Sequence, residues 1–304
     1  MQKARPPPPP PKPKSLSSNV VPPATVSKVN HPHRRKRGLG WPWDQPSTHF
    51  ALYQPHATSG KISWIFNWEC WIPDGVPPGV EWVPCVRTAA NARDQLDPFL
   101  TDIIQNRGIQ VSALLGFNEP EIPDQANLPA HEAAKLWTEV VVPAKRKFRL
   151  RLGSPGMSSD VSRSKPWLNS FLSILAGAHE MDFLVVHWYG PHFADMRAFL
   201  EDMHATYGLP LWVNEFACST MGNGEAASVD EVEAFIKEAV PWLDACDWVE
   251  RYAYFGNKNV GVWVGRANNF TEEDEDEEAG DGAKETDGRP RPRLTRVSRL
   301  YCEL

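Results

Sequence analysis

The chain has 304 residues, which is enough for one large domain with tails. It contains no run of 18 apolar residues, which excludes a membrane-spanning helix, and its first residues lack the apolar stretch of a signal peptide. Residues 1–37 hold nine Lys and Arg and no acid, so the rest of the chain has 23 basic against 38 acidic residues, a net charge of −15. That excess of negative charge argues against nucleic acid as a partner of the folded part.

The first 37 residues differ in composition from the rest of the chain. Six consecutive prolines from Pro6 to Pro11 predict extended polyproline II, either as a disordered linker or as a ligand for an SH3 or WW domain. The basic cluster Arg34–Arg37 fits a nuclear signal, an anion-binding patch or a dibasic processing site before Gly38. We therefore expect a disordered Pro-rich basic tail over residues 1–37 and a folded domain over residues 38–304.

From Gly38 onward, short apolar segments alternate with longer amphipathic ones. The segments predict eight strands: Gly38–Trp43, Ile62–Trp68, Glu81–Val86, Ser112–Asn118, Arg151–Pro155, Phe183–Tyr189, Leu211–Phe216 and Val249–Phe255. Several of them are almost entirely apolar, as strands buried on both faces are.

Apolar residues at helical spacing lie between most of these strands. They predict helices over Ala92–Arg107, Ala130–Ala144, Trp167–His179, Ala194–Tyr207 and Val229–Ala245. Eight strands that alternate with helices predict an α/β fold of the (β/α)8 TIM-barrel type.

Two regions depart from a regular barrel. Residues 70–80 are too short and too rich in Pro and Gly for a helix, so one outer helix is expected to be missing or replaced by a loop between strands two and three. Seven consecutive acids, Glu272–Glu278, predict a disordered acidic insertion over residues 270–292. A final amphipathic segment comes after it, over Leu294–Leu304.

Five cysteines are too few for a disulfide framework, and none forms a C-x-x-C pair that would indicate zinc. Buried free thiols are the favoured interpretation. A bridge between Cys70 and Cys85 remains an alternative in an oxidising compartment.

Two glutamates end predicted strands on the same side of the barrel. Glu119 follows Asn118 at the end of strand four, and Glu215 follows Asn214 on strand seven. Barrel enzymes carry their catalytic groups at these strand ends. Two facing carboxyl groups suit hydrolysis of a glycosidic bond, because one donates a proton and the other attacks the anomeric carbon. A structural salt bridge is the alternative for either glutamate alone.

Four motifs extend this pattern: KRGLGWPW, LLGFNEP, VVHWYG and LWVNEFA. Together they resemble glycoside hydrolase family 128, the fungal alkali-sensitive-linkage-protein-like catalytic core of β-1,3-glucanases. The resemblance covers about residues 36–260 and resumes at LTRVSRLY. It implies a retaining enzyme with Glu119 as acid/base, Glu215 as nucleophile and Asn118 orienting the substrate.

Aromatic and histidine side chains at strand ends are the candidate substrate-binding residues. His187 is expected to hydrogen-bond the nucleophile or a sugar hydroxyl, with a core histidine as the alternative. The other candidates are aromatic, and for Trp43, Trp68 and Tyr254 the alternative is core packing: Trp188, Tyr189, Trp43, Trp68 and Tyr254.

The sequence thus predicts an endo-acting retaining β-1,3-glucanase that needs no cofactor and no metal. The alternatives are a catalytically inactive glucan-binding cell-wall protein on the same barrel, or a barrel carried by a functional Pro-rich arm. We expect a monomer whose partner is β-glucan, not nucleic acid or membrane. The sequence start indicates the cytoplasm, whereas the family resemblance indicates a cell-wall or extracellular protein.

Overall fold

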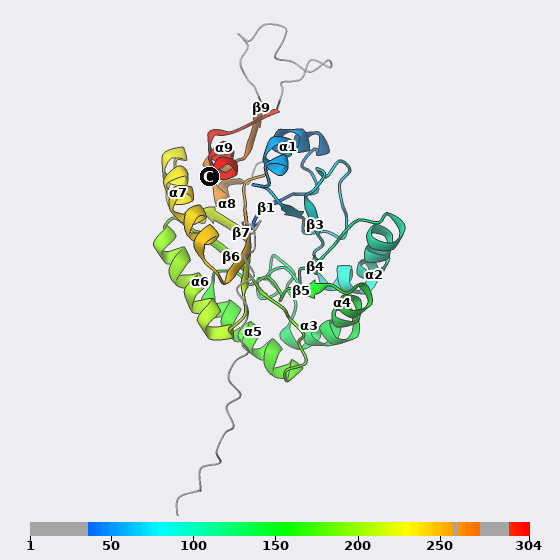
Figure 1. Cartoon of the computed structure of the whole chain (residues 1–304). Helices are drawn as coiled ribbons and strands as arrows, with labels where there is room; N and C mark the ends of the chain where they lie inside the picture. Colours follow the sequence, from blue (N-terminus) through cyan, green and yellow to red (C-terminus); the bar gives the residue numbers. More distant parts are fainter. Residues whose placement is uncertain (1–35, 258–260, 274–291) are drawn as a thin grey trace, which may run out of the picture. The chain divides into compact units, whose positions relative to one another are not determined.

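Six parallel strands form the main sheet, in the order β3-β2-β1-β8-β7-β6 (Figure 1). The computed structural model describes residues 36–257, 261–273 and 292–304. The strands of this sheet are β1 Arg37–Gly40, β2 Trp64–Phe66, β3 Glu81–Val83, β6 Leu184–Gly190, β7 Leu211–Cys218 and β8 Val249–Tyr254.

The two remaining predicted strands form a separate parallel pair, β4 Ala113–Leu114 and β5 Arg151–Leu152. Isolated parallel bridges connect this pair to the main sheet, Cys85 with Leu115 on one side and Gly153 with Phe183 on the other. All eight predicted strands are therefore present, most of them shorter than predicted, and the α/β fold with a parallel sheet is confirmed. The junctions beside β4 and β5 are single bridges instead of continuous ladders.

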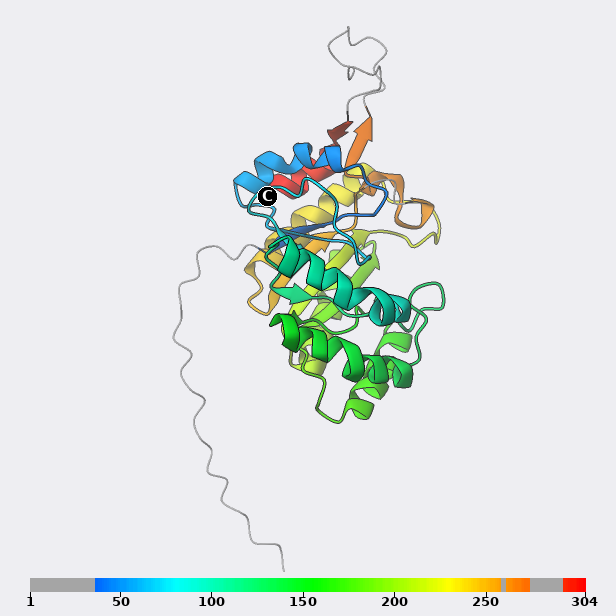
Figure 2. The same cartoon turned by 90° about the vertical axis from the view of Figure 1, so that its right-hand side faces the viewer.

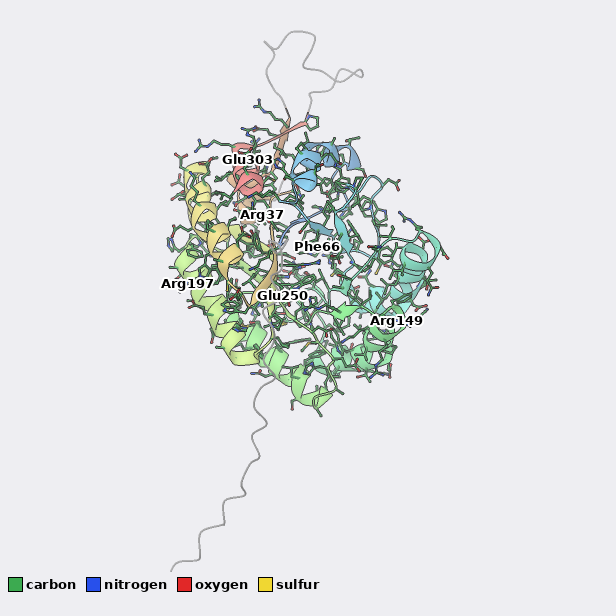
Figure 3. All side chains as sticks on the ribbon, viewed as in Figure 1. Arg37, Phe66, Arg149, Arg197, Glu250 and Glu303 are labelled. Carbon is green, nitrogen blue, oxygen red and sulfur yellow. The ribbon has the colours of Figure 1, made fainter. Side chains whose placement is uncertain are left out.

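Large apolar side chains fill the space inside the strands. Trp64, Phe183 and Trp212 are almost completely buried in one cluster, and the rings of Phe183 and Trp212 stack at 4.0 Å. Figure 3 shows the labelled Phe66 within the ring of strands, whereas Arg149 lies on the outer surface. A filled interior leaves the ends of the strands as the place where a substrate can bind.

Helices cover the outer side of the strands in both views (Figures 1 and 2). The long helices are α5 Val161–Leu175, α6 Phe193–Tyr207, α7 Val229–Ala245 and α9 Arg296–Glu303. The predicted helix over Ala92–Arg107 is composite, with π-helical turns Asn91–Gln95 and Thr101–Asn106 around α2 Leu96–Leu100. Likewise, Ala130–Ala144 corresponds to α3 Ala130–Leu136, a π turn Trp137–Val141 and α4 Val142–Phe148.

One helix of the structure was not predicted. The loop that was predicted in place of a helix between strands two and three is observed. Helix α1 Phe50–Thr58 contains Pro55 and lacks a regular apolar stripe, so its sequence gives little helical signal. Residues 67–80, all of which the structure describes, form no helix between β2 and β3. A short helix, α8 Gly261–Val264, follows β8.

The folded domain begins earlier than predicted. Lys36 is buried and its Nζ donates to the carbonyl oxygens of Leu243 (3.0 Å) and Cys246 (2.7 Å) at the end of α7. Arg37 opens β1 and its guanidinium donates to the Tyr252 hydroxyl at 3.0 Å. Lys36 and Arg37 therefore pack with the folded part, and their burial argues against processing after Arg37 in the folded domain. The rest of the predicted tail lies outside the described residues.

The stems of the predicted acidic insertion are paired. Strand β9 Thr271–Glu273 runs antiparallel to β10 Pro292–Leu294, so the ends of the predicted range 270–292 belong to the fold. Residues 274–291 lie outside the described residues.

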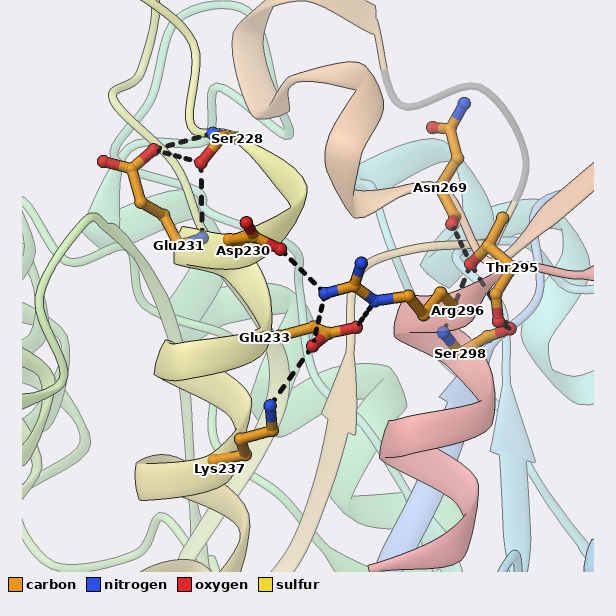
Figure 4. A network of polar contacts seen from close by, with 9 residues as sticks. All are labelled: Ser228, Asp230, Glu231, Glu233, Lys237, Asn269, Thr295, Arg296 and Ser298. Atoms are coloured by element: carbon orange, nitrogen blue, oxygen red, sulfur yellow. Dashed lines mark hydrogen bonds and ion pairs between the residues drawn. The ribbon is translucent and has the colours of Figure 1, made fainter.

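The C-terminal helix is tied to the rest of the fold by an ion-pair network (Figure 4). Arg296 of α9 pairs with Asp230 (2.7 Å) and Glu233 (2.9 Å) of α7.

All five cysteines are free thiols, and Cys302 of α9 is buried. The structure therefore has no bridge between Cys70 and Cys85.

Candidate active site

Glu215 lies inside β7 and is buried, opposite His187 of β6 in the strand register. The register of β6 against β7 shifts between Val186 and His187, and such irregularities re-aim side chains beside active sites. Two donors hold the Glu215 carboxyl group. The Trp68 indole N–H donates to Oε1 at 2.5 Å, and the Tyr189 hydroxyl donates to Oε2 at 2.7 Å. Both oxygens are thus fixed in direction.

Glu119 stands on a turn beyond the end of β4. Its φ angle is +42°, a left-handed conformation that is costly for a residue with a side chain and is often found at functional sites. The Glu119 N–H donates to the Gly156 carbonyl at 2.8 Å, and the Asn118 N–H donates to the Arg87 carbonyl at 3.0 Å. These bonds hold the turn between the ends of the neighbouring strands.

His187 lies between the two glutamates. Its Nδ1 is 2.7 Å from Glu119 Oε1, and its Nε2 is 3.6 Å from Glu215 Oε1. The ring has no exposed surface, and it fits closely because residue 156 is a glycine. A Cβ atom at position 156 would lie 2.8 Å from His187 Nε2. The hydrogen bond of His187 is to Glu119, and the expected bond to Glu215 or to a sugar hydroxyl stays a prediction.

Burial and charge set the protonation of this group. Burial alone lowers the pKa of His187, but the Glu215 charge and the hydrogen bond with Glu119 outweigh it and raise the pKa to about 9. Burial raises the pKa of Glu215, and the charge of Glu119 adds to this, while the His187 cation and the donors Tyr189 and Trp68 oppose it. The imidazole between the two carboxyl groups is therefore a cation at neutral pH.

The two asparagines that precede the glutamates differ in their hydrogen bonds. Asn118 is buried beside Glu119, and its amide N–H donates to Gln125 Oε1 at 3.2 Å. Asn214 precedes Glu215, and its buried Oδ1 has no hydrogen-bond partner among the described residues. The Asn118 side chain is therefore already oriented next to Glu119.

Two of the predicted binding aromatics face away from the glutamates. Trp188 alternates with His187 and Tyr189 along β6 and packs on Phe199 of α6, with ring centroids 5.5 Å apart. Tyr254 has no exposed surface, stacks on Phe270 at 5.3 Å and donates its hydroxyl to Asn268. Burial places the Tyr254 ring in the core, whereas the Trp188 ring is half-buried, and a role in substrate binding stays a prediction for both.

The other two tryptophans point to different uses. Trp68 packs against Phe66 and Phe255 and serves the site as the donor to Glu215. Trp43 follows β1 and is 70% exposed, so its face is open to a ligand, but no contact joins it to the glutamates. Its role in substrate binding stays a prediction.

Three further side chains after strand ends were not singled out from the sequence. Trp71 after β2 and Trp263 after β8 are exposed aromatics that follow strands next to β1 in the sheet. Arg87 after β3 pairs with Glu69 at 2.9 Å. Their position after strand ends was the available signal, but exposure cannot be read from a sequence.

The same three groups are also a set of metal ligands by type. One ligand atom each from Glu119, His187 and Glu215 lies within 4.8 Å of the others. His187 Nδ1 and both Glu215 oxygens already have hydrogen-bond partners, so a metal would have to replace those bonds.

A parallel α/β fold that brings together two glutamates from separate strands, one oriented by two donors and one next to a histidine, is the arrangement of a glycoside hydrolase. The comparisons with known proteins agree. The family described as "Glycosyl hydrolase catalytic core" matches residues 38–281, and the chain belongs to this family.

One known protein is similar in sequence to most of this chain. Alkali-sensitive linkage protein 1 of Schizosaccharomyces pombe is 30% identical over 236 residues, which are 77% of this chain. The chain spans only 41% of the length of that relative.

Solved structures give the same family. A curdlan-specific exo-β-1,3-glucanase of glycoside hydrolase family 128 from Blastomyces gilchristii, in complex with glucose, is 28% identical, with a TM-score of 0.64 over 90% of this chain and 100% of that chain. A family 128 endo-β-1,3-glucanase from Amycolatopsis mediterranei, in complex with laminaritriose, shares the fold at 23% identity, with a TM-score of 0.64 over 88% of this chain and 98% of that chain. The resemblance to family 128 is confirmed.

In the part of the chain that the structure describes, no helix has the length and apolar character needed to cross a bilayer.

Proposed function

We propose that this protein is a retaining, endo-acting β-1,3-glucanase on a (β/α)8 barrel. The observation that carries the proposal is the spacing of the two glutamates. Oxygen atoms of Glu119 and Glu215 lie within 4.8 Å of each other, with His187 between them. Retaining glycosidases hold their carboxyl groups about 5–5.5 Å apart, and inverting ones about 6.5–9.5 Å apart.

We infer a separate role for each glutamate from its hydrogen bonds. Glu215 is the nucleophile, because two donors fix its oxygens and stabilise its charged form. It attacks the anomeric carbon while Glu119 donates a proton to the leaving glycosidic oxygen. In the second step Glu119 removes a proton from water, which attacks the same carbon and releases Glu215.

His187 is proposed to act on the glutamates in both steps. The acid/base must hold a proton in the first step and accept one in the second. His187 is hydrogen-bonded to Glu119, and its positive charge offsets part of the repulsion between the two carboxylates. Asn118, held by Gln125, orients the sugar beside Glu119.

The substrate class is inferred from the relatives. The solved structures that share this fold include exo- and endo-acting β-1,3-glucanases. Endo action is supported by exposed tryptophans that follow β1, β2 and β8, since several separated aromatic faces suit a long polymer: Trp43, Trp71 and Trp263.

Product analysis on laminarin-type β-1,3-glucan tests this function, with the natural chain compared with Glu215→Gln. Short oligosaccharides of mixed length from the natural chain alone are expected. Glucose as the only early product would show exo action. Binding by both proteins with no release by either would favour the glucan-binding alternative.

A further inference from the structure

A second carboxyl group lies beside the acid/base and has no part in the mechanism above. Glu121 follows Glu119 by two residues on the same turn, and its Oε1 accepts a hydrogen bond from the Ser158 N–H at 2.8 Å. Ser158 lies two residues after Gly156, whose carbonyl accepts the Glu119 N–H. The Glu121 side chain therefore ties the turn that carries Glu119 to the segment after β5.

The remaining polar atoms of this contact are unpaired. Glu121 Oε2 and the Ser158 hydroxyl oxygen are both buried and have no hydrogen-bond partner among the described residues. A charged carboxylate with an unpaired buried oxygen is costly, whereas a neutral acid carries a proton on that oxygen and costs less to bury.

The surroundings favour the neutral acid. Burial raises the pKa of Glu121, and the negative charge of Glu119 raises it further, although the bonds from Ser158 oppose this. Glu119 and His187 are the charged groups that interact with Glu121, and the His187 cation is shared with both catalytic glutamates.

We propose that Glu121 is a positioning residue that, as a neutral acid bonded to Ser158, fixes the strained turn of Glu119 without adding a third negative charge to the site. The proposal rests on the proposed function for its kinetic consequences only. Ionisation of Glu121 at higher pH places an unpaired charge in the interior, which loosens the turn and misplaces Glu119.

The first test does not depend on activity. Carboxyl 13C resonances of the full chain labelled on glutamate are followed from pH 4 to 9, and the Glu121 resonance is assigned by its loss in Glu121→Gln. Exposed Glu132 on α3, assigned with Glu132→Gln, is the matched control. We expect Glu121 to stay protonated at pH values where Glu132 is ionised. Titration of Glu121 together with Glu132 would overturn the proposal.

The second test separates positioning from stability. Glutamine mimics the neutral acid, because its oxygen accepts from the Ser158 N–H and its amide donates to the hydroxyl. Glu121→Gln is therefore expected to keep kcat within about twofold of the natural chain. It should also remove the fall in kcat at high pH that ionisation of Glu121 causes in the natural chain. Glu121→Ala is expected to lower kcat about tenfold or more with little change in KM, as a misplaced catalytic group does.

Two outcomes would contradict the role. A loss in Glu121→Gln as large as in Glu121→Ala would show that the charge is needed. A lower melting temperature in Glu121→Ala with unchanged kcat would show a purely structural residue. A natural chain that hydrolyses no glucan would instead remove the proposed function, and the resonance titration would still decide the protonation of Glu121.

Discussion

The two glutamates of the candidate site are held by different kinds of structure. Glu215 lies within an eight-residue strand that pairs with β6 over seven positions and with β8 on its other side. Glu119 stands on a left-handed turn after the two-residue strand β4, which isolated bridges connect to the main sheet. The proposed nucleophile thus belongs to a continuous ladder of strands, whereas the proposed acid/base depends on a few bonds from neighbouring segments. The contrast teaches that the position of Glu119 depends more on single contacts than the position of Glu215 does.

The largest expected effect on activity comes from a change at Glu215, in the ladder of β6, β7 and β8. Glu215→Gln keeps the size of the side chain and both neighbouring donors but removes the attacking carboxylate. We expect hydrolysis of all glucans and all activated glucosides to fall to background, since no covalent intermediate can form. Initial rates on laminarin and on an aryl β-glucoside, with the fold checked by circular dichroism, measure this. Residual activity that depends on the leaving group would assign Glu215 the other role.

Removal of the proton donor on the turn is expected to cost less. Glu119→Gln should slow hydrolysis of natural glucan by about 10²–10⁴-fold, which is the usual contribution of general acid catalysis. The loss should be much milder on substrates with good leaving groups, because they depart without a proton. Kinetics on a series of aryl glucosides check this, and equal losses on activated and unactivated substrates would contradict the assignment.

The donors to Glu215 sharpen the comparison further. Trp68→Phe keeps a ring between Phe66 and Phe255 but removes the N–H that donates to Oε1. Hydrogen bonds to charged groups contribute about 1.5–3 kcal/mol, so kcat is expected to fall roughly tenfold or more. Trp248→Phe, at a residue that precedes β8 and so lies at the opposite end of that strand, is the matched control and should leave kcat almost unchanged. The same kcat for both variants would show that the indole bond does not position the nucleophile.

The last prediction concerns the free energy of unfolding and His187, which lies between the two glutamates. The pKa of His187 rises from 6.5 in the unfolded chain to about 9 in the fold. A raised pKa stabilises the fold fully below about pH 6.5, and the contribution is lost as the pH rises through about 9. The natural chain should therefore lose up to about 3 kcal/mol of unfolding free energy across this range, relative to His187→Gln. Urea titrations of both proteins at pH 6 and pH 9.5 measure it, and parallel losses would contradict the shift.

The sequence predicted the features that depend on local pattern. Apolar runs located the eight strands, and two strand-end glutamates located the site, because both signals are written in residue order. Tyr189 alternates with His187 on β6 and donates to Glu215, whereas the same alternation sends Trp188 to the opposite face of the strand. Substrate binding by these two residues stays a prediction.

The features that the sequence could not predict depend on contacts between distant segments. The close fit of His187 against Gly156 and the bond from Trp68 to Glu215 join residues that the chain places far apart. Tyr254 was expected in the site because it ends a strand, but Phe270 and Asn268 from a later loop bury it. Helix α1 was missed because Pro55 and mixed polarity hide its helical period.

The configuration of the first product tests the central claim most directly. Proton NMR of early laminarin hydrolysis, before the anomers equilibrate, distinguishes the two mechanisms through the new reducing end. The natural chain is expected to release the β anomer first, and Glu215→Gln is expected to release none. The α anomer as the first product would show inversion and contradict the nucleophilic role of Glu215.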